Sequence, residues 1–180
     1  MSGGPGDAVS FTRADIERLF QLLDRELAAA GIQGEVHVVG GAVMCLALDA
    51  RAATRDVDAW FQPATEVRRA AARVAARAHV PEAWLNDAVK GWLGGRGEFD
   101  RWLDLPHLKV FVAQPAYLLA MKCVAMRLGE EFHDLDDVRY LLRYLDITRL
   151  ADALAVVTQY FDPEQIPPKT RLALEELLPG

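Results

Sequence analysis

The chain has 180 residues, of which 52% are hydrophobic, enough for one compact domain or a small domain with a helical extension. Its 20 basic and 26 acidic side chains give a formal charge of −6, which argues against a broad, non-specific nucleic-acid binder. No apolar run reaches the roughly 18 residues that span a membrane, and no signal peptide is evident, so we expect a cytoplasmic protein without a membrane partner. Cys45 and Cys123 lie in apolar runs without metal-ligand spacing, which favours reduced core thiols over a disulfide or a metal site.

The first half of the chain is predicted to alternate between helices and strands. Residues 1–10 are rich in Gly, Pro and Ser and are predicted to be a disordered tail. Thr12, with Asp15 three residues on, predicts a capping box at the start of a helix that Gly31 ends. The other elements predicted in this half are a strand at 35–39, a short helix at 42–48, a strand at 55–61 and a helix from Pro63 to about residue 78.

The second half is predicted to change from strands to helices. We expect a strand at 80–86, a glycine-rich turn at 91–97 and a hairpin formed by 99–105 and 108–113. From Pro115 onward the spacing predicts helices at about 115–128, 135–144, 148–160 and 168–178. The predicted fold is therefore α+β, with a small mixed sheet and flanking helices at 11–113 and a C-terminal helical region at 114–180.

Gly40 and Gly41 end the first predicted strand and lead into a helix. Glycines at such a place let a phosphate approach backbone N–H groups closely, and the helix dipole favours an anion. The alternative interpretation is a tight strand-to-helix turn that binds no ligand. The glycines alone do not distinguish the two.

Asp56 and Asp58 are two residues apart in the next predicted strand, so their side chains share one face. Two neighbouring carboxylates repel each other unless water or a cation separates them, and Asp is unfavourable in strands. The pair therefore indicates a hard divalent ion, and Mg²⁺ suits carboxylate and phosphate oxygens. The alternative is a solvated acidic face on an edge strand.

A glycine turn, a short helix and an Asp-x-Asp strand, in that order, resemble the nucleotidyltransferase superfamily, which has the DNA polymerase beta-like fold. The resemblance covers about residues 36–142 and implies that Gly40 and Gly41 bind a nucleoside triphosphate. It also implies that Asp56 and Asp58 bind two Mg²⁺ ions and act as catalytic residues. The stretch from Pro115 to Leu142 is similar to the helical region of small bacterial nucleotidyltransferases of toxin–antitoxin and abortive-infection systems.

The resemblance further implies a third catalytic and metal-binding carboxylate after the helix that follows Asp-x-Asp. Asp87 is the first choice and Asp104 the second. Gly41 stands where many active members of the superfamily have Ser, so one hydroxyl ligand for phosphate is missing here.

Several basic residues are further candidates for binding the nucleotide. Arg51 and Arg55 flank the predicted metal site and are plausible partners for phosphate. Lys122 interrupts an apolar run, which indicates either a contact with the triphosphate or a salt-bridged lysine on a helix edge. Asp134 and Asp137 fit helix capping better than a role in the site.

Two functions follow from these residues. The first is a Mg²⁺-dependent nucleotidyltransferase that transfers a nucleoside monophosphate to a hydroxyl of an unknown acceptor: a protein, an RNA end or a small molecule. Such an enzyme would fit a toxin–antitoxin or defence system, with a cognate partner protein. The alternative is a catalytically weak or inactive module of the same fold that binds a nucleotide or a partner protein. The third carboxylate distinguishes them.

Overall fold

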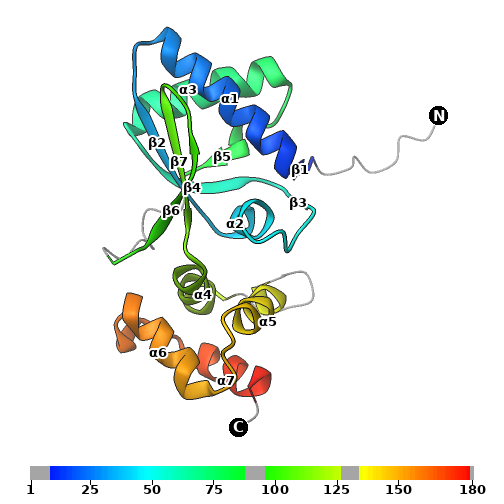
Figure 1. Cartoon of the computed structure of the whole chain (residues 1–180), viewed down its shortest axis with the longest axis vertical. Helices are drawn as coiled ribbons and strands as arrows, with labels where there is room; N and C mark the ends of the chain where they lie inside the picture. Colours follow the sequence, from blue (N-terminus) through cyan, green and yellow to red (C-terminus); the bar gives the residue numbers. More distant parts are fainter. Residues whose placement is uncertain (1–8, 88–95, 127–133, 179–180) are drawn as a thin grey trace, which may run out of the picture. The chain divides into compact units, whose positions relative to one another are not determined.

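The computed structural model of the chain describes residues 9–87, 96–126 and 134–178 (Figure 1). The chain forms two units: the first comprises Met1–Lys90 and Arg101–Val112, and the second Gly91–Asp100 and Ala113–Gly180. The predicted α+β class is confirmed. Most of the predicted tail at 1–10 and of the glycine-rich turn at 91–97 lies outside the described residues.

The first unit is built on a five-stranded mixed sheet with the strand order β5-β4-β2-β7-β6. The central strand β2 is antiparallel to β4 and parallel to β7, and β4 is parallel to β5. The strands are β2 (Gly34–Val39), β4 (Val57–Gln62), β5 (Leu85–Asn86), β6 (Phe99–Asp104) and β7 (Leu108–Ala113). The predicted hairpin is confirmed as β6 and β7.

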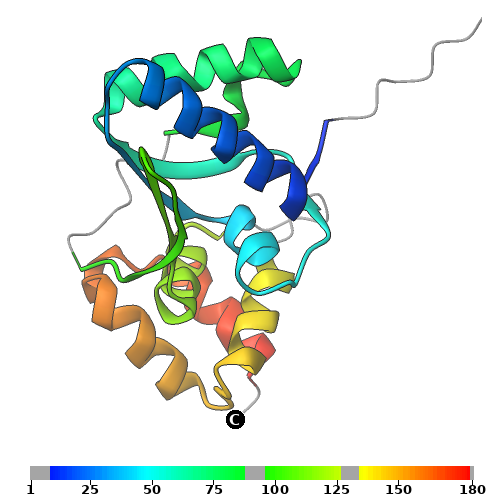
Figure 2. The same ribbon diagram turned by 45° about the horizontal axis from the view of Figure 1, so that its top comes forward.

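Helices α1 (Arg13–Ala29) and α3 (Ala64–Ala78) lie together on one face of this sheet (Figure 2). Alternate strand residues are fully buried on that face, as period-2 spacing requires. They pack against the apolar stripe of each helix. The core of the first unit contains Ile16, Leu19, Phe20, Leu23, Val36, Val38, Val57, Ala59, Val67, Val74, Val110 and Val112, among others.

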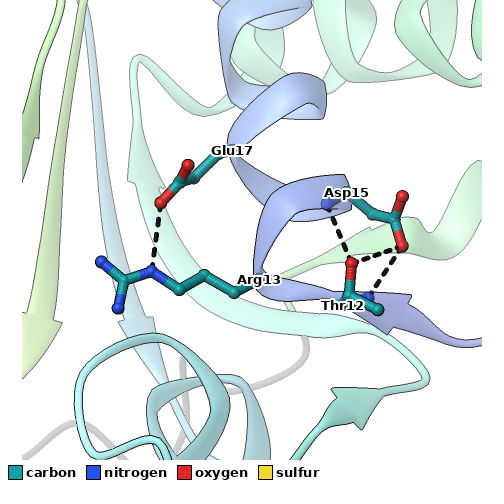
Figure 3. A network of polar contacts seen from close by, with 4 residues as sticks. All are labelled: Thr12, Arg13, Asp15 and Glu17. Carbon is teal, nitrogen blue, oxygen red and sulfur yellow. Dashed lines mark hydrogen bonds and ion pairs between the residues drawn. The ribbon is translucent and has the colours of Figure 1, made fainter.

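The capping box predicted at the start of α1 is confirmed (Figure 3). The Asp15 amide donates to the Thr12 hydroxyl (3.2 Å), and the Asp15 carboxylate accepts from the Thr12 amide (2.9 Å). One turn further on, Arg13 pairs with Glu17 at 3.1 Å. The two capping-box hydrogen bonds satisfy backbone donors that have no partner within the helix.

Two segments of the first unit differ from their predictions. The strand predicted at 55–61 begins only at Val57, because the preceding residues, β3 (Ala53–Thr54), pair instead with β1 (Phe11–Thr12) in a separate ribbon. Asp56 therefore precedes the strand. The strand predicted at 80–86 is a 3₁₀ turn, η1 (Glu82–Trp84), followed by the short β5.

The second unit is helical, as predicted. Its elements are α4 (Pro115–Val124), α5 (Asp134–Tyr144), α6 (Leu150–Tyr160), the 3₁₀ turn η2 (Pro163–Gln165) and α7 (Pro168–Leu177). Helix α4 packs against α5 and α6, and α6 contacts α7. Cys123 in this unit and Cys45 in the first are buried, which confirms their predicted place in the core. Among the described helices, none combines the length and the apolar character that crossing a membrane requires.

Candidate functional site

The turn after β2 depends on a glycine. Gly40 has φ 69° and ψ −150°, a conformation that essentially only glycine adopts. Its carbonyl accepts a hydrogen bond from the Val43 amide at 3.1 Å, which starts helix α2 (Gly41–Leu46). The chain therefore reverses sharply at the end of the central strand, and Gly40 is required for that geometry.

The turn lies directly against Asp58 and Arg51. In the β2–β4 pairing Val39 is opposite Asp58, so the carboxylate comes beside the next residue, Gly40. A Cβ atom on Gly40 would lie 3.3 Å from Asp58 Oδ2. A Cβ atom on Gly41 would lie 2.9 Å from Arg51 Nη1. The structure thus brings four predicted site residues together, and the bare glycine backbone is what leaves room for the acid and the guanidinium.

Asp56 lies just before β4, one residue outside the strand. Asp56 and Asp58 are partly exposed, whereas Val57 and Ala59 are fully buried. The Thr54 hydroxyl, which is part-buried, donates to the Asp56 carbonyl at 3.2 Å and fixes this approach to the strand. The Asp58 carboxylate therefore belongs to the sheet face opposite α1 and α3, which we call the site face, and Asp56 precedes the strand at the same end of the sheet. Arg55 is exposed.

The residue beside Asp58 on β5 is an amide. Asn86 is the Cα partner of Asp58 in the parallel β4–β5 pairing, so these two side chains share the site face. Asp87 is the next residue, where alternation reverses the direction of the side chain. Its carboxylate is paired with Arg68 of α3. Asp87, the first choice for the third carboxylate, is thus paired with α3, which covers the sheet face opposite the site face.

Asp104, the second choice, lies at the opposite end of the sheet. It ends β6 just before a turn in which the Leu105 amide bonds to the Leu108 carbonyl at 2.8 Å. Leu108 pairs with Gly34 at the start of β2, six residues before Gly40. Six strand residues span about 20 Å at roughly 3.3 Å each. Asp104 is therefore not part of the site.

The donor set at Asp56 and Asp58 fits Mg²⁺. This ion binds through one or two carboxylates and completes its shell with water and phosphate oxygens. Within residues 9–87, 96–126 and 134–178, no three His, Cys, Asp or Glu side chains gather as a metal-binding group. Asp58 is the acidic side chain in contact with the glycine turn, and Asp56 lies two residues before it in the chain.

Lys122 belongs to the second unit, where its ammonium bridges two helices. It pairs with Asp137 at 2.7 Å and with Asp134 at 3.2 Å, both in the first turn of α5. The three side chains are only 11%, 4% and 7% exposed, respectively. These contacts join α4 to α5 and match the salt-bridged interpretation of Lys122.

Two residues of the site are absent from the sequence-based prediction. Asn86 adjoins Asp58, and Trp60 follows Asp58 on the site face. The alternation V-D-A-W-F-Q carries the signal for Trp60, because it is two residues after Asp58. Asn86 carries no comparable signal, because its place beside Asp58 depends on the β4–β5 register.

No protein-family model, curated protein or solved structure compared with the chain matches it.

Proposed function

We propose that this chain is a Mg²⁺-dependent nucleotidyltransferase that transfers a nucleoside monophosphate from a nucleoside triphosphate to a hydroxyl acceptor, which loses its proton as pyrophosphate leaves. The observation that supports this most is the contact of the Gly40–Gly41 turn with Asp58 and Arg51. A tight turn alone explains the glycines, and a solvated strand alone explains the acids. Neither explains why the acid and a guanidinium lie against the same two bare backbone positions.

In this proposal the residues in and beside the turn have distinct roles. Asp56 and Asp58 would hold Mg²⁺, which when bound would neutralise phosphate charge and lower the pKa of an attacking hydroxyl. The bare backbone of Gly40 and Gly41 lets Asp58 and Arg51 lie beside the turn, where they would flank the phosphates. Arg51 supplies a fixed positive charge beside them, and its planar guanidinium matches two phosphate oxygens. These residues act by positioning and electrostatics rather than by covalent chemistry.

The test is incubation of the full chain with each α-labelled nucleoside triphosphate, Mg²⁺ and a cell extract. We expect label in one class of macromolecule or small molecule, and that class identifies the acceptor. Asp58→Asn keeps the size of the side chain and removes the charge that holds the metal, so it should abolish transfer.

The matched control is Glu17→Gln, which neutralises an exposed carboxylate of the same unit, on α1. It should transfer label like the unchanged protein. Equal transfer by Asp58→Asn and the unchanged protein would contradict the proposal. So would the absence of any Mg²⁺-dependent nucleotide binding.

One observation favours the second function, a binding module with weak or no catalysis. The neighbour of Asp58 on β5 is Asn86, and Asp87 is paired with Arg68. An amide oxygen is a weaker ligand for a second cation than a carboxylate. Nucleotide binding that depends on Asp58, without transfer of label, would establish this alternative.

A further inference from the structure

The site face carries three rows of side chains that cross the central strands. The first row contains Asp58 and its partners Asn86 and Val39. The third row is polar and contains Gln62, Glu35 and Lys109. Between them lies an aromatic row of Trp60, His37 and Phe111, in register on β4, β2 and β7.

The aromatic row is continuous from ring to ring. The His37 ring stacks on Phe111, with centroids 4.7 Å apart and an interplanar angle of 9°. On the other side it meets Trp60 at 4.8 Å. The Arg101 guanidinium carbon, on β6, lies 5.9 Å from the centre of the Phe111 ring. Strands β4, β2 and β7 thus each contribute one ring to the row, and β6 contributes the guanidinium at its end.

The row differs from the core of the first unit. Core residues of the same strands, Val36, Ala59 and Val110, are fully buried against the helices. Trp60, His37 and Phe111 are each partly exposed. Burial lowers the pKa of His37 from its usual 6.5, so at neutral pH the ring is uncharged and adds aromatic rather than ionic character. The row therefore places partly exposed aromatic side chains beside a polar site.

The distance between the aromatic row and Asp58 matches the separation of phosphate and base in a nucleotide. Trp60 is two residues from Asp58 on one strand face, about 7 Å at roughly 3.3 Å per residue. A ribose separates the phosphates of a nucleotide from its base. Phosphates held beside Asp58 and the glycine turn thus leave the base within reach of the aromatic row. The change from acidic to aromatic along the strand parallels the change from phosphate to base along a nucleotide.

We propose that the Trp60–His37–Phe111 row is the stacking platform for the base of the nucleoside triphosphate. This inference rests on the proposed nucleotidyltransferase site. Stacking uses the π-face that every base presents, so the platform binds purine and pyrimidine nucleotides alike, and Arg101 extends it at one edge.

Calorimetric titrations of the full chain with Mg²⁺ test the platform, with ATP, CTP and inorganic triphosphate as separate ligands. The variant Trp60→Leu keeps an apolar side chain of moderate size and removes the ring, whereas Trp60→Phe keeps a ring. We expect Trp60→Leu to weaken ATP and CTP binding by at least about fivefold and to leave inorganic triphosphate unchanged. Trp60→Phe should retain most of the affinity.

The control is Tyr144→Leu, which removes an aromatic ring that is 56% exposed in the second unit. It should bind all three ligands like the unchanged protein. If the circular dichroism of Trp60→Leu shows that it does not fold, Phe111→Leu replaces it with the same expectation.

The outcomes separate this inference from the proposed function. If triphosphate and ATP bind the unchanged protein equally, the phosphate site stands and the platform is refuted. If Trp60→Leu weakens triphosphate as much as ATP, the platform is also refuted, because the effect is not on the base. If no ligand binds the unchanged protein, both proposals are refuted.

Discussion

Alanine substitutions at the adjacent residues Gly40 and Gly41 should affect different properties. The first should lower stability, and the second should weaken ligand binding. At Gly40 the conformation of φ 69° and ψ −150° is strained for any residue with a Cβ atom, which costs about 1–3 kcal/mol. The new Cβ atom would also lie 3.3 Å from Asp58 Oδ2. Gly40→Ala should therefore lower the free energy of unfolding by about 1–3 kcal/mol.

Gly41 lies in the first turn of α2, where alanine is favoured by up to about 1 kcal/mol over glycine. The added methyl would lie 2.9 Å from Arg51 Nη1, at the end of a flexible side chain that can shift. Gly41→Ala should thus change stability by less than about 1 kcal/mol. It should nevertheless weaken Mg²⁺-triphosphate binding about tenfold, because it displaces the guanidinium and covers the bare backbone.

Urea denaturation followed by far-UV circular dichroism gives the stability of both variants, and calorimetry gives the binding. The decisive comparison is the order of the two free energies of unfolding. A Gly40→Ala protein as stable as the unchanged chain would refute the role assigned to the positive φ. A Gly41→Ala protein with unchanged triphosphate binding would refute the role assigned to the second glycine.

Three further predictions concern stability. Lys122→Met removes the cation from two nearly buried carboxylates and should cost about 3 kcal/mol in urea denaturation; a loss below 1 kcal/mol would show that the pairs are weak. Thr12→Ala deletes the cap of α1 and should cost about 1 kcal/mol by the same assay, whereas Thr158→Ala, on the surface of α6, should cost less. Burial lowers the pKa of His37 below 6.5, so the unfolded chain binds the proton more tightly and stability should fall as the pH drops from 6.5 towards the folded pKa. In His37→Phe this part of the pH dependence should vanish from melting curves at pH 5–7, and an unchanged profile would contradict the assignment.

The sequence was sufficient where the determining interactions are local. The capping box of α1 needs only Thr12 and a residue three positions on, and the structure has both of its hydrogen bonds. The helices from Pro115 onward follow from apolar spacing within each segment. The strand that carries Asp58 likewise follows from the alternation within one segment, although it begins at Val57, after Asp56.

Contacts between segments that are distant in the chain could not be predicted from the sequence. Lys122 interrupts an apolar run in a way that fits a ligand contact or an ion pair equally well. Only the packing of α4 on α5 brings Asp134 and Asp137 to its ammonium. In the same way, the burial of the Glu26 carboxylate, a residue that is 5% exposed, is explained by its ion pairs with Arg73 and Arg77 of α3. No feature of its own helix explains it.

The third carboxylate shows how a shift of one residue in register changes the chemistry. Asn86 and Asp87 are adjacent, and only one of them can point to the site face. The parallel pairing of β4 with β5 gives that position to Asn86, while Arg68 engages Asp87. At the end of the sheet that carries the glycine turn, the negative charge thus comes from Asp56 and Asp58, next to an amide and a guanidinium. In the proposed function, Asp56 and Asp58 would hold one Mg²⁺, and a second ion would have to rely on Asn86 and the nucleotide. The choice between nucleotide transfer and nucleotide binding alone would then depend on Asn86, the weakest ligand of the proposed site.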